Sequence, residues 1–480
     1  MSEDFDKIRI DLYGYVVASV KEGLDVISKL IQDKKHIGTY YNWPQMSFHA
    51  SGLPRFSEEF FTQGPIKYRD AFGGPKNDAL KSFLNLWEFA KKQALIKKRL
   101  LHPNMLQERE DDQKFNVRTA DFFKCMVLSI PANLIDRYIH INSNSKFNKE
   151  VFDLIYDEYT ASIFEERLFI DICVPILFVK FSFDNLTLGS DVKIEKMNEQ
   201  FQLARAPIKT YGPGVHESVL PCATHMFVLK NWHVSNSSQW LLSEIISNVS
   251  AYPIEQINNL FALLRIVTNS TTGYAQLLTR PKNWADSYKA YLPPLYGTSI
   301  RAYPNKFENY YWNKKDIPEF SSYICEEVGS LFSKLSGADE NSIRVAIKRL
   351  NQCFLREDEQ DSVIDATIGL EALLSDNDHQ EMTHKLAMRV GALSNIPDAQ
   401  LKKPYHTYQE IKKIYAYRSA VVHGSKKTDK KKEIKLDDIR SVPASDLATE
   451  YLCKVLRILI SNPAYRKPEE IDKKLLLNHL

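Results

Sequence analysis

The hydrophobic pattern of this 480-residue chain changes twice along its length, and these changes constrain the fold more than any other feature. Up to about residue 160, apolar residues recur at the spacing of amphipathic helices, as in the stretches 12–31 and 79–101. From Leu168 the pattern becomes short apolar and alternating runs bounded by Gly, Pro and Asn, which predicts a sheet interrupted by helices. Beyond Pro318 every segment has helical periodicity again.

These changes predict three regions in a chain that is too long for one ordinary core. Residues 1–160 are expected to be mainly helical, residues 161–315 to form a mixed α+β domain, and residues 316–480 to form a helical domain. The predicted fold class is therefore an α+β N-terminal region followed by an all-α helical bundle. The helices expected in the last region are 320–335, 341–355, 359–375, 380–394, 407–423 and 444–461, with a short one after Pro468.

Charge is distributed unevenly within the last region, although the whole chain carries a net charge of only +3. Residues 316–401 contain 7 basic and 16 acidic residues, whereas residues 402–435 contain 11 basic and 3 acidic residues. A lysine loop in the basic part is suited to the phosphate backbone of RNA, and it comprises Lys426, Lys427, Lys430, Lys431 and Lys432. A solvated loop without a partner is an equally open interpretation.

Directly before the lysine loop, Arg418 and His423 are separated by the four residues Ser-Ala-Val-Val. An Arg can hold a phosphate with two parallel hydrogen bonds, and a His can move a proton near neutral pH, so the pair is the minimum requirement for RNA cleavage without a metal. Thr407 and Glu410 have the spacing of a capping box that starts a helix, and Gly424 supplies the stop. The alternative is a helix-terminal His that only caps backbone carbonyls.

Neighbouring residues are candidates for supporting this pair. The helix dipole favours a cation at the last turn, so we hypothesise that the imidazole of His423 is biased toward its protonated form. Tyr415, one turn before Arg418, is expected to pack first and to line a cleft second. Glu371 could orient Arg418 through a carboxylate pair, although an ordinary surface Glu is equally plausible. Arg389 is expected to be a structural or RNA-contacting cation.

Three blocks of sequence, in this order, resemble the HEPN domain of the ApeA-like family of bacterial proteins. They are DSVIDATIGLEALL at 361–374, HKLAMRVGAL at 384–393 and IKKIYAYRSAVVHG at 411–424. The resemblance covers roughly residues 317–465 and leaves the larger N-terminal part unassigned. It implies that the last region is a HEPN helical bundle.

The resemblance also implies an activity. In HEPN ribonucleases an Arg-x(4 to 6)-His motif is the catalytic signature, two protomers bring their motifs together in a cleft, and no metal is required. Arg418 and His423 match that motif, so the resemblance implies a homodimeric, metal-independent endoribonuclease without a cofactor that leaves 2′,3′-cyclic phosphate ends. It suggests antiphage defence of the abortive-infection type, with RNA and plausibly tRNA as substrate. Under this interpretation residues 161–315 form a sensor or substrate-selecting domain, and a phage-derived trigger acts at the N-terminal region. One position departs from the pattern, because Ser419 follows the Arg where many active members have Asn, Asp or His.

Two other functions stay open. The helical region could be a non-catalytic HEPN module that binds RNA or dimerises, in which case Ser419 marks a lapsed active site. The protein could also be the toxin of a two-gene toxin–antitoxin pair.

The remaining features bear on compartment and metal binding. Six cysteines form no CxxC pair, which favours small buried residues in a reducing compartment and hence the cytoplasm. No secretory signal is recognised at the N-terminus, and the most apolar stretch, 168–179, is interrupted by Asp171 and too short to span a bilayer, so no membrane is expected. A group of possible ligands has spacings that match no zinc pattern, and no metal is predicted there: His216, Cys222, His225 and His233.

Overall fold

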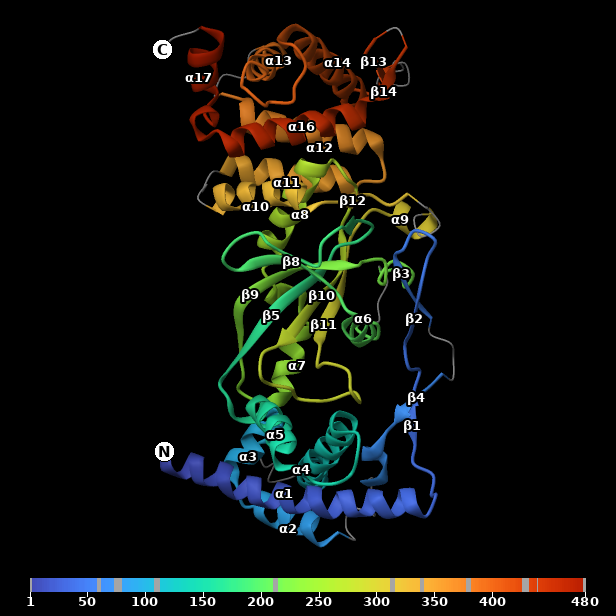
Figure 1. Cartoon of the computed structure of the whole chain (residues 1–480). Helices are drawn as coiled ribbons and strands as arrows, with labels where there is room; N and C mark the ends of the chain where they lie inside the picture. Colours follow the sequence, from blue (N-terminus) through green and yellow to red (C-terminus); the bar gives the residue numbers. More distant parts are fainter. Residues whose placement is uncertain are drawn as a thin grey trace.

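The computed structural model describes residues 2–57, 62–72, 80–107, 113–209, 215–310, 316–336, 341–376, 381–424, 431–437 and 439–477. Their helices and strands stack in three layers (Figure 1). N-terminal helices form one end, a six-stranded sheet lies in the middle, and C-terminal helices form the other end. The mixed helix and sheet composition agrees with the α+β pattern of the sequence.

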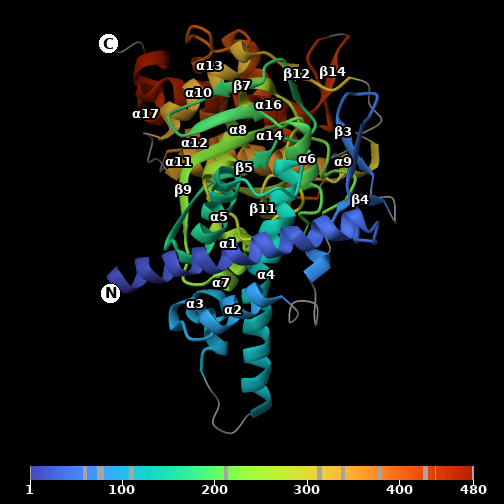
Figure 2. The same ribbon diagram turned by 60° about the horizontal axis from the view of Figure 1, so that its bottom comes forward.

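The N-terminal layer is built from helices α1 (Ser2–Gln32), α2 (Lys81–Ala90), α3 (Ala94–Leu100), α4 (Gln113–Asn142) and α5 (Lys149–Phe164). Leu12, Val16 and Val20, at i, i+4 and i+8 of α1, are buried in its core, and the long α1 crosses α4 (Figure 2). The stretch 79–101, expected as one helix, is divided in two by a turn at Lys91–Gln93. An arm of short strands runs from this layer beside the sheet: β1 (Thr39–Tyr41), β2 (Gln45–Phe48), β3 (Pro54–Ser57) and β4 (Gln63–Ile66).

The central sheet has the strand order β11-β10-β5-β9-β8-β7, and all its pairs are antiparallel. Its strands are β5 (Arg167–Pro175), β7 (Asn185–Thr187), β8 (Val192–Lys196), β9 (His225–Ser235), β10 (Tyr274–Pro281) and β11 (Tyr296–Ala302). The apolar run 192–204 is strand only as far as Lys196, because Asn198 accepts a hydrogen bond from the Phe201 N–H and starts α6 (Glu199–Arg205). Helix α7 (Gln239–Ser247) follows β9.

Alternate residues of the strands pack on opposite faces of the sheet. Ile172 and Val174 belong to the cluster that continues into helix α8 (Ile254–Thr268) and the C-terminal helices. Cys173 faces the other way, into a smaller cluster with Phe178 and Phe307, whose rings lie 4.4 Å apart. The sheet is therefore covered on both faces.

The C-terminal layer contains α10 (Ser322–Ser336), α11 (Asn341–Leu355), α12 (Glu359–Leu374), α13 (Met382–Leu393), α14 (Pro404–Val422), α16 (Ala444–Ser461) and α17 (Pro468–Ile471), and α9 (Lys306–Tyr310) precedes it. The all-α expectation for residues 316–480 needs a correction. Strand β12 (Glu319–Phe320) pairs with β6 (Lys180–Phe181), and β13 (Glu433–Lys435) and β14 (Ser441–Pro443) form a hairpin after the lysine loop. The region is predominantly helical with these short strands added.

One hydrophobic cluster extends from the sheet through α8 into the C-terminal helices. It joins Ile172 of β5 and Leu263 of α8 to Leu370 of α12 and Leu456 of α16, all at most 2% exposed. The segments on either side of the expected boundary at 315/316 thus share one core.

Helix α14 begins earlier than its capping-box pattern predicts. Pro404 occupies its first turn, where a missing N–H costs nothing. Thr407 lies inside the helix and donates its hydroxyl to the carbonyl of Lys402 at 3.1 Å, and Glu410 pairs with the Lys402 ammonium at 2.6 Å. The expected stop is present, because α14 ends at Val422 and Gly424 takes a left-handed φ of 58°.

All six cysteines are free thiols, and Cys125 differs from the expectation because it is exposed while the other five are buried. No helix in the described part of the chain combines the length and apolarity needed to cross a lipid bilayer.

Candidate functional site

One face of α14 emerges from the core toward its C-terminal end and carries Arg418 with it. Ile411 and Tyr415 are buried, the Arg418 side chain is 33% exposed, and Val422 is 50% exposed. The 4, 3, 4 spacing of these residues keeps them on one side of the helix. Packing of the first two residues therefore fixes the direction in which the guanidinium projects.

Among the described residues, the guanidinium of Arg418 has one carboxylate neighbour, Glu371 of α12. The Nη2 and Oε1 atoms lie 3.8 Å apart, which is an ion pair but too long for a hydrogen bond. The Nε atom of Arg418 is buried and has no hydrogen-bond partner among the described residues. A buried N–H without an acceptor is unfavourable, so the guanidinium is incompletely hydrogen-bonded within the described residues.

The environment disfavours negative charge on Glu371. Burial raises the pKa of this carboxyl, and the charge of Arg418 opposes that shift without cancelling it. Tyr415 lies 5% exposed beside the pair and donates its hydroxyl to the carbonyl of Thr367 at 3.4 Å. Burial raises the pKa of Tyr415, and Glu371 adds to the rise. Tyr415 is therefore an uncharged, buried side chain next to Arg418.

His423 lies at the C-terminal end of α14 with an exposed side chain. Its backbone N–H donates to the carbonyl of Ser419 at 3.1 Å, which closes the last turn. The Ser419 side chain is also exposed. Within the described residues, no hydrogen bond joins His423 to Arg418, so the two side chains are separate groups near the end of α14.

The lysine loop lies partly outside the described residues, which include Lys431 and Lys432 but not Lys426, Lys427 or Lys430. The ammonium of Lys431 donates to the carbonyl of Ala416 on α14 at 3.1 Å. Lys432 pairs with Glu359 at the start of α12, at 2.9 Å. Both ammonium groups thus bind protein atoms and attach the segment after the motif to the bundle.

Arg389 is a structural cation in this structure. It is 4% exposed and donates to both oxygens of Asp472, to Asp376 and to the carbonyl of Leu374. These bonds join α13 to the segment after α17. An RNA-contacting role is not favoured by this burial.

The scattered His and Cys residues of the sheet region do not converge. His225 is bonded to the carbonyl of Phe183 at 2.6 Å, His216 to the hydroxyl of Ser218 at 2.5 Å, and the Cys222 thiol lies 3.2 Å from the carbonyl of Ser218. In the part of the chain that the structure describes, no group of three or more His, Cys, Asp or Glu side chains is placed to hold a metal ion.

Sequence reasoning missed Glu359 as a partner of the lysine loop. An acidic residue in the first turn of a helix is explained by the helix dipole alone, so nothing in the sequence pointed to Lys432.

Comparison of the chain with protein-family models, with curated proteins and with solved structures gives no match.

Proposed function

We propose that this protein is a metal-independent endoribonuclease that acts as a homodimer through its C-terminal helical region. The observation that carries the proposal is the exposed end of α14. There the guanidinium of Arg418, whose buried Nε has no partner among the described residues, precedes the exposed His423. Five residues of helix separate them by about 7.5 Å of rise and about 140° of rotation around the axis, which favours a site completed by a second protomer.

The chemistry follows from these two groups. One His423 takes the proton of a ribose 2′-hydroxyl, and the resulting oxygen attacks the adjacent phosphorus in line. The His423 of the second protomer protonates the departing 5′-oxygen, and paired Arg418 side chains hold the phosphate oxygens as charge builds. The products carry a 2′,3′-cyclic phosphate and a 5′-hydroxyl.

The dimer supplies the second proton-transfer group. One protomer offers a single imidazole at this site, and His406, near the other end of α14, lies about 25 Å away by helical rise. A symmetric contact between two copies brings the second His423 to the same phosphate.

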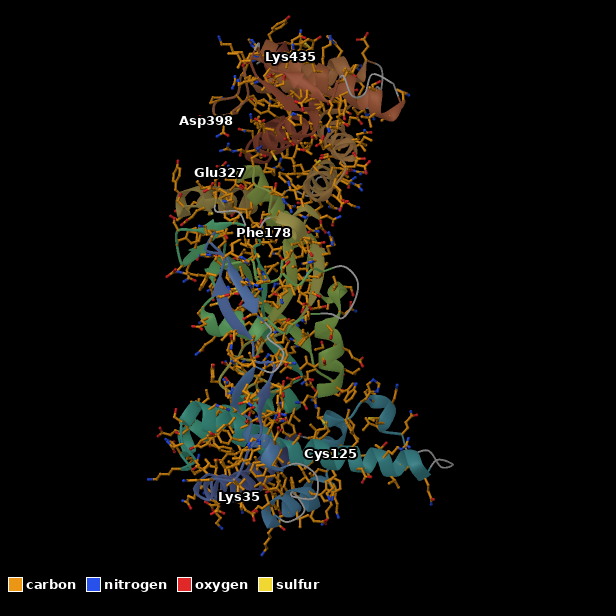
Figure 3. The ribbon with its side chains drawn as sticks, turned by 90° about the vertical axis from the view of Figure 1, so that its right-hand side faces the viewer. Lys35, Cys125, Phe178, Glu327, Asp398 and Lys435 are labelled. Atoms are coloured by element: carbon orange, nitrogen blue, oxygen red, sulfur yellow. The ribbon has the colours of Figure 1, made fainter. Side chains whose placement is uncertain are left out.

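The proposed setting is antiphage defence of the abortive-infection type, with tRNA as a plausible substrate, and it rests on the resemblance to HEPN proteins. The N-terminal region is proposed to receive a phage-derived trigger. Lys435 of β13, close to the motif, and Lys35, just after α1, lie at opposite ends of the molecule (Figure 3). A trigger at the N-terminal helices would therefore act through the sheet layer.

The test is incubation of the purified protein with total RNA in EDTA, followed by analysis of the new RNA ends. We expect 2′,3′-cyclic phosphate ends from the parent protein and a loss of about 10² to 10⁴ in rate for His423→Ala, because one acid–base group is removed. His406→Ala is the matched control, since it removes an exposed His from the same helix and should cleave like the parent.

Undiminished cleavage by folded His423→Ala protein would refute the catalytic assignment. RNA binding without cleavage by the parent would support the second candidate, a non-catalytic HEPN module. Glu371 favours that candidate, because it already neutralises part of the charge on Arg418.

A further inference from the structure

A cavity of about 610 Å³ lies where the β2–β3 hairpin meets the segments that follow α6 (Figure 1). The hairpin contributes His49, Arg55 and Phe56, and the other walls come from residues within 206–209 and 216–221. A cavity of this volume is the size of a small-molecule site. Its lining contains neither Arg418 nor His423, so it is separate from the end of α14.

Positive charge exceeds negative charge in the lining of this cavity. Glu217 is the one carboxylate among the described lining residues, and it accepts a hydrogen bond from the ammonium of Lys209 at 2.9 Å. That ion pair adds no net charge. Arg55 is exposed and pairs with no carboxylate among the described residues, so its charge is not compensated there.

A buried guanidinium behind the wall adds a second charge of the same sign. Arg205 is 0% exposed, and among the described residues its donors meet uncharged oxygens at 2.7 to 3.0 Å, which belong to the side chains of Gln202 and Gln276 and to the carbonyls of Leu220 and Pro221. Leu220 and Pro221 line the cavity, so the guanidinium lies directly behind the wall that they form. Burial lowers the pKa of Arg205 to about 9, which still leaves it charged at neutral pH.

The charge of Arg205 can act on the cavity without contact between Arg205 and a ligand. A buried charge is screened less than an exposed one, because the protein interior has a lower effective dielectric constant than water. The imidazole of His49 lies in the same positive surroundings: burial lowers its pKa, and the charge of Arg55 lowers it further. An anion in the cavity would therefore be stabilised by both guanidinium groups.

Phe56 gives the cavity an aromatic side as well as a charged one. The centre of its ring lies 5.1 Å from the guanidinium carbon of Arg205, which holds the ring over the buried cation. Arg55 and Phe56 are successive residues of β3, so their side chains leave opposite faces of the strand. A ligand that contacts both must be an extended molecule with a charged end and a flat apolar part, which a small inorganic ion is not.

The amount of uncompensated charge selects the kind of anion. Two guanidinium charges match a phosphate monoester, which carries about −1.5 to −2 at neutral pH, better than they match a single carboxylate. We propose that this cavity binds a mononucleotide, whose phosphate pairs with Arg55 and competes with Glu217 for Lys209, and whose base lies on Phe56. Binding involves no cleavage of RNA, so this inference stands independently of the proposed function.

The experiment is calorimetric titration of the full chain with AMP and with UMP, in EDTA so that no metal bridges phosphate to protein. Both should bind, because stacking on an aromatic ring tolerates any base. Arg55→Gln should raise Kd about tenfold or more, because it removes a charge-assisted contact with the phosphate. Arg118→Gln is the matched control, since it removes an exposed arginine of α4 that does not line the cavity and should leave Kd unchanged.

Two further variants separate the charged side of the site from the aromatic side. Glu217→Gln should lower Kd several-fold, because it releases Lys209 from its internal partner. Phe56→Leu keeps an apolar side chain but loses the flat ring, so it should weaken AMP about fivefold or more and leave the binding of inorganic phosphate unchanged. Adenosine and inorganic phosphate should each bind at least about tenfold more weakly than AMP.

Absence of saturable binding of both nucleotides, or equal Kd in the parent and Arg55→Gln, would overturn the site. Equal Kd for AMP and inorganic phosphate would overturn the assignment to nucleotides. Loss of AMP binding in folded His423→Ala protein would place the nucleotide at the end of α14 and overturn the cavity as its site. Should Phe56→Leu fail to fold, the comparison of AMP with inorganic phosphate decides whether the base contributes.

Discussion

Two arginines in the C-terminal layer differ strongly in how many hydrogen bonds their guanidinium groups make. Arg389 is 4% exposed and its guanidinium donates to two carboxylates and a backbone carbonyl at 2.6 to 2.9 Å. Arg418 is 33% exposed, and among the described residues its one carboxylate contact is 3.8 Å long and its Nε has no hydrogen-bond partner. The first arrangement is a completed network, whereas the second leaves donors for a further group.

The difference indicates how to separate a structural arginine from a binding one. A guanidinium whose donors are all hydrogen-bonded contributes to the stability of the fold, and this contribution is lost when one of its partners is removed. An unsaturated guanidinium at the surface contributes little to stability and can form new bonds without breaking strong ones. Variants of the two residues should therefore affect different measurements.

The largest expected effect is on cleavage by Arg418→Lys. An ammonium keeps the charge but cannot reproduce the planar fork of a guanidinium, so the rate should fall by about 10² or more. Stability should change by less than about 1 kcal/mol, because the ion pair to Glu371 is long and partly solvated. Single-turnover cleavage and urea unfolding measure the two quantities. Parent-like cleavage by Arg418→Lys would show that the site requires only charge.

Arg389→Met should show the reverse. It leaves Asp376 and Asp472 without their buried cation, so the free energy of unfolding should fall by roughly 3 kcal/mol. The cleavage rate per folded molecule should stay close to that of the parent. A specific loss of cleavage in fully folded Arg389→Met protein would place Arg389 in the functional surface and remove the contrast between the two sites.

The smallest effect is expected for Glu371→Gln. Burial raises the pKa of Glu371, so the folded state binds the carboxyl proton more tightly than the unfolded state does. The stability that this proton contributes is lost as pH rises through the pKa of the folded state. Gln has no such loss, so the stability of the variant relative to the parent should increase as pH rises from about 4 to 7, by less than about 1 kcal/mol. Unfolding curves at several pH values measure this. A variant that becomes relatively less stable with rising pH would mean that the Arg418 pair outweighs burial.

Most of the helices and strands could be predicted from periodicity, because the signal is local. The helix expected at 341–355 coincides with α11 (Asn341–Leu355), and the end of α14 follows from Gly424. The apolar run at 192–204 forms a strand only as far as Lys196, since the cap at Asn198 starts a helix there.

The surroundings of the candidate site were less predictable, because they depend on residues far apart in the chain. The pairing of Arg418 with Glu371 was anticipated as one of two possibilities, and the structure places the two in contact. Nothing local could show that Lys431 and Lys432 bind back to α14 and α12. Such contacts arise only when α12, α14 and α16 pack together.

The core that the sheet shares with α8 and the C-terminal helices determines which parts of the molecule can unfold separately. Apolar side chains of α11, α12 and α16 would be exposed to water if the C-terminal helices separated from the sheet, so the two layers should unfold in one cooperative transition. The N-terminal helices have a cluster of their own, and among the described residues Ala285 and Tyr288 are the buried members that it takes from the sheet layer. Partial opening at that smaller junction would cost less free energy, and the molecule is therefore better suited to loosen at its N-terminal end than to release the helices that carry Arg418 and His423.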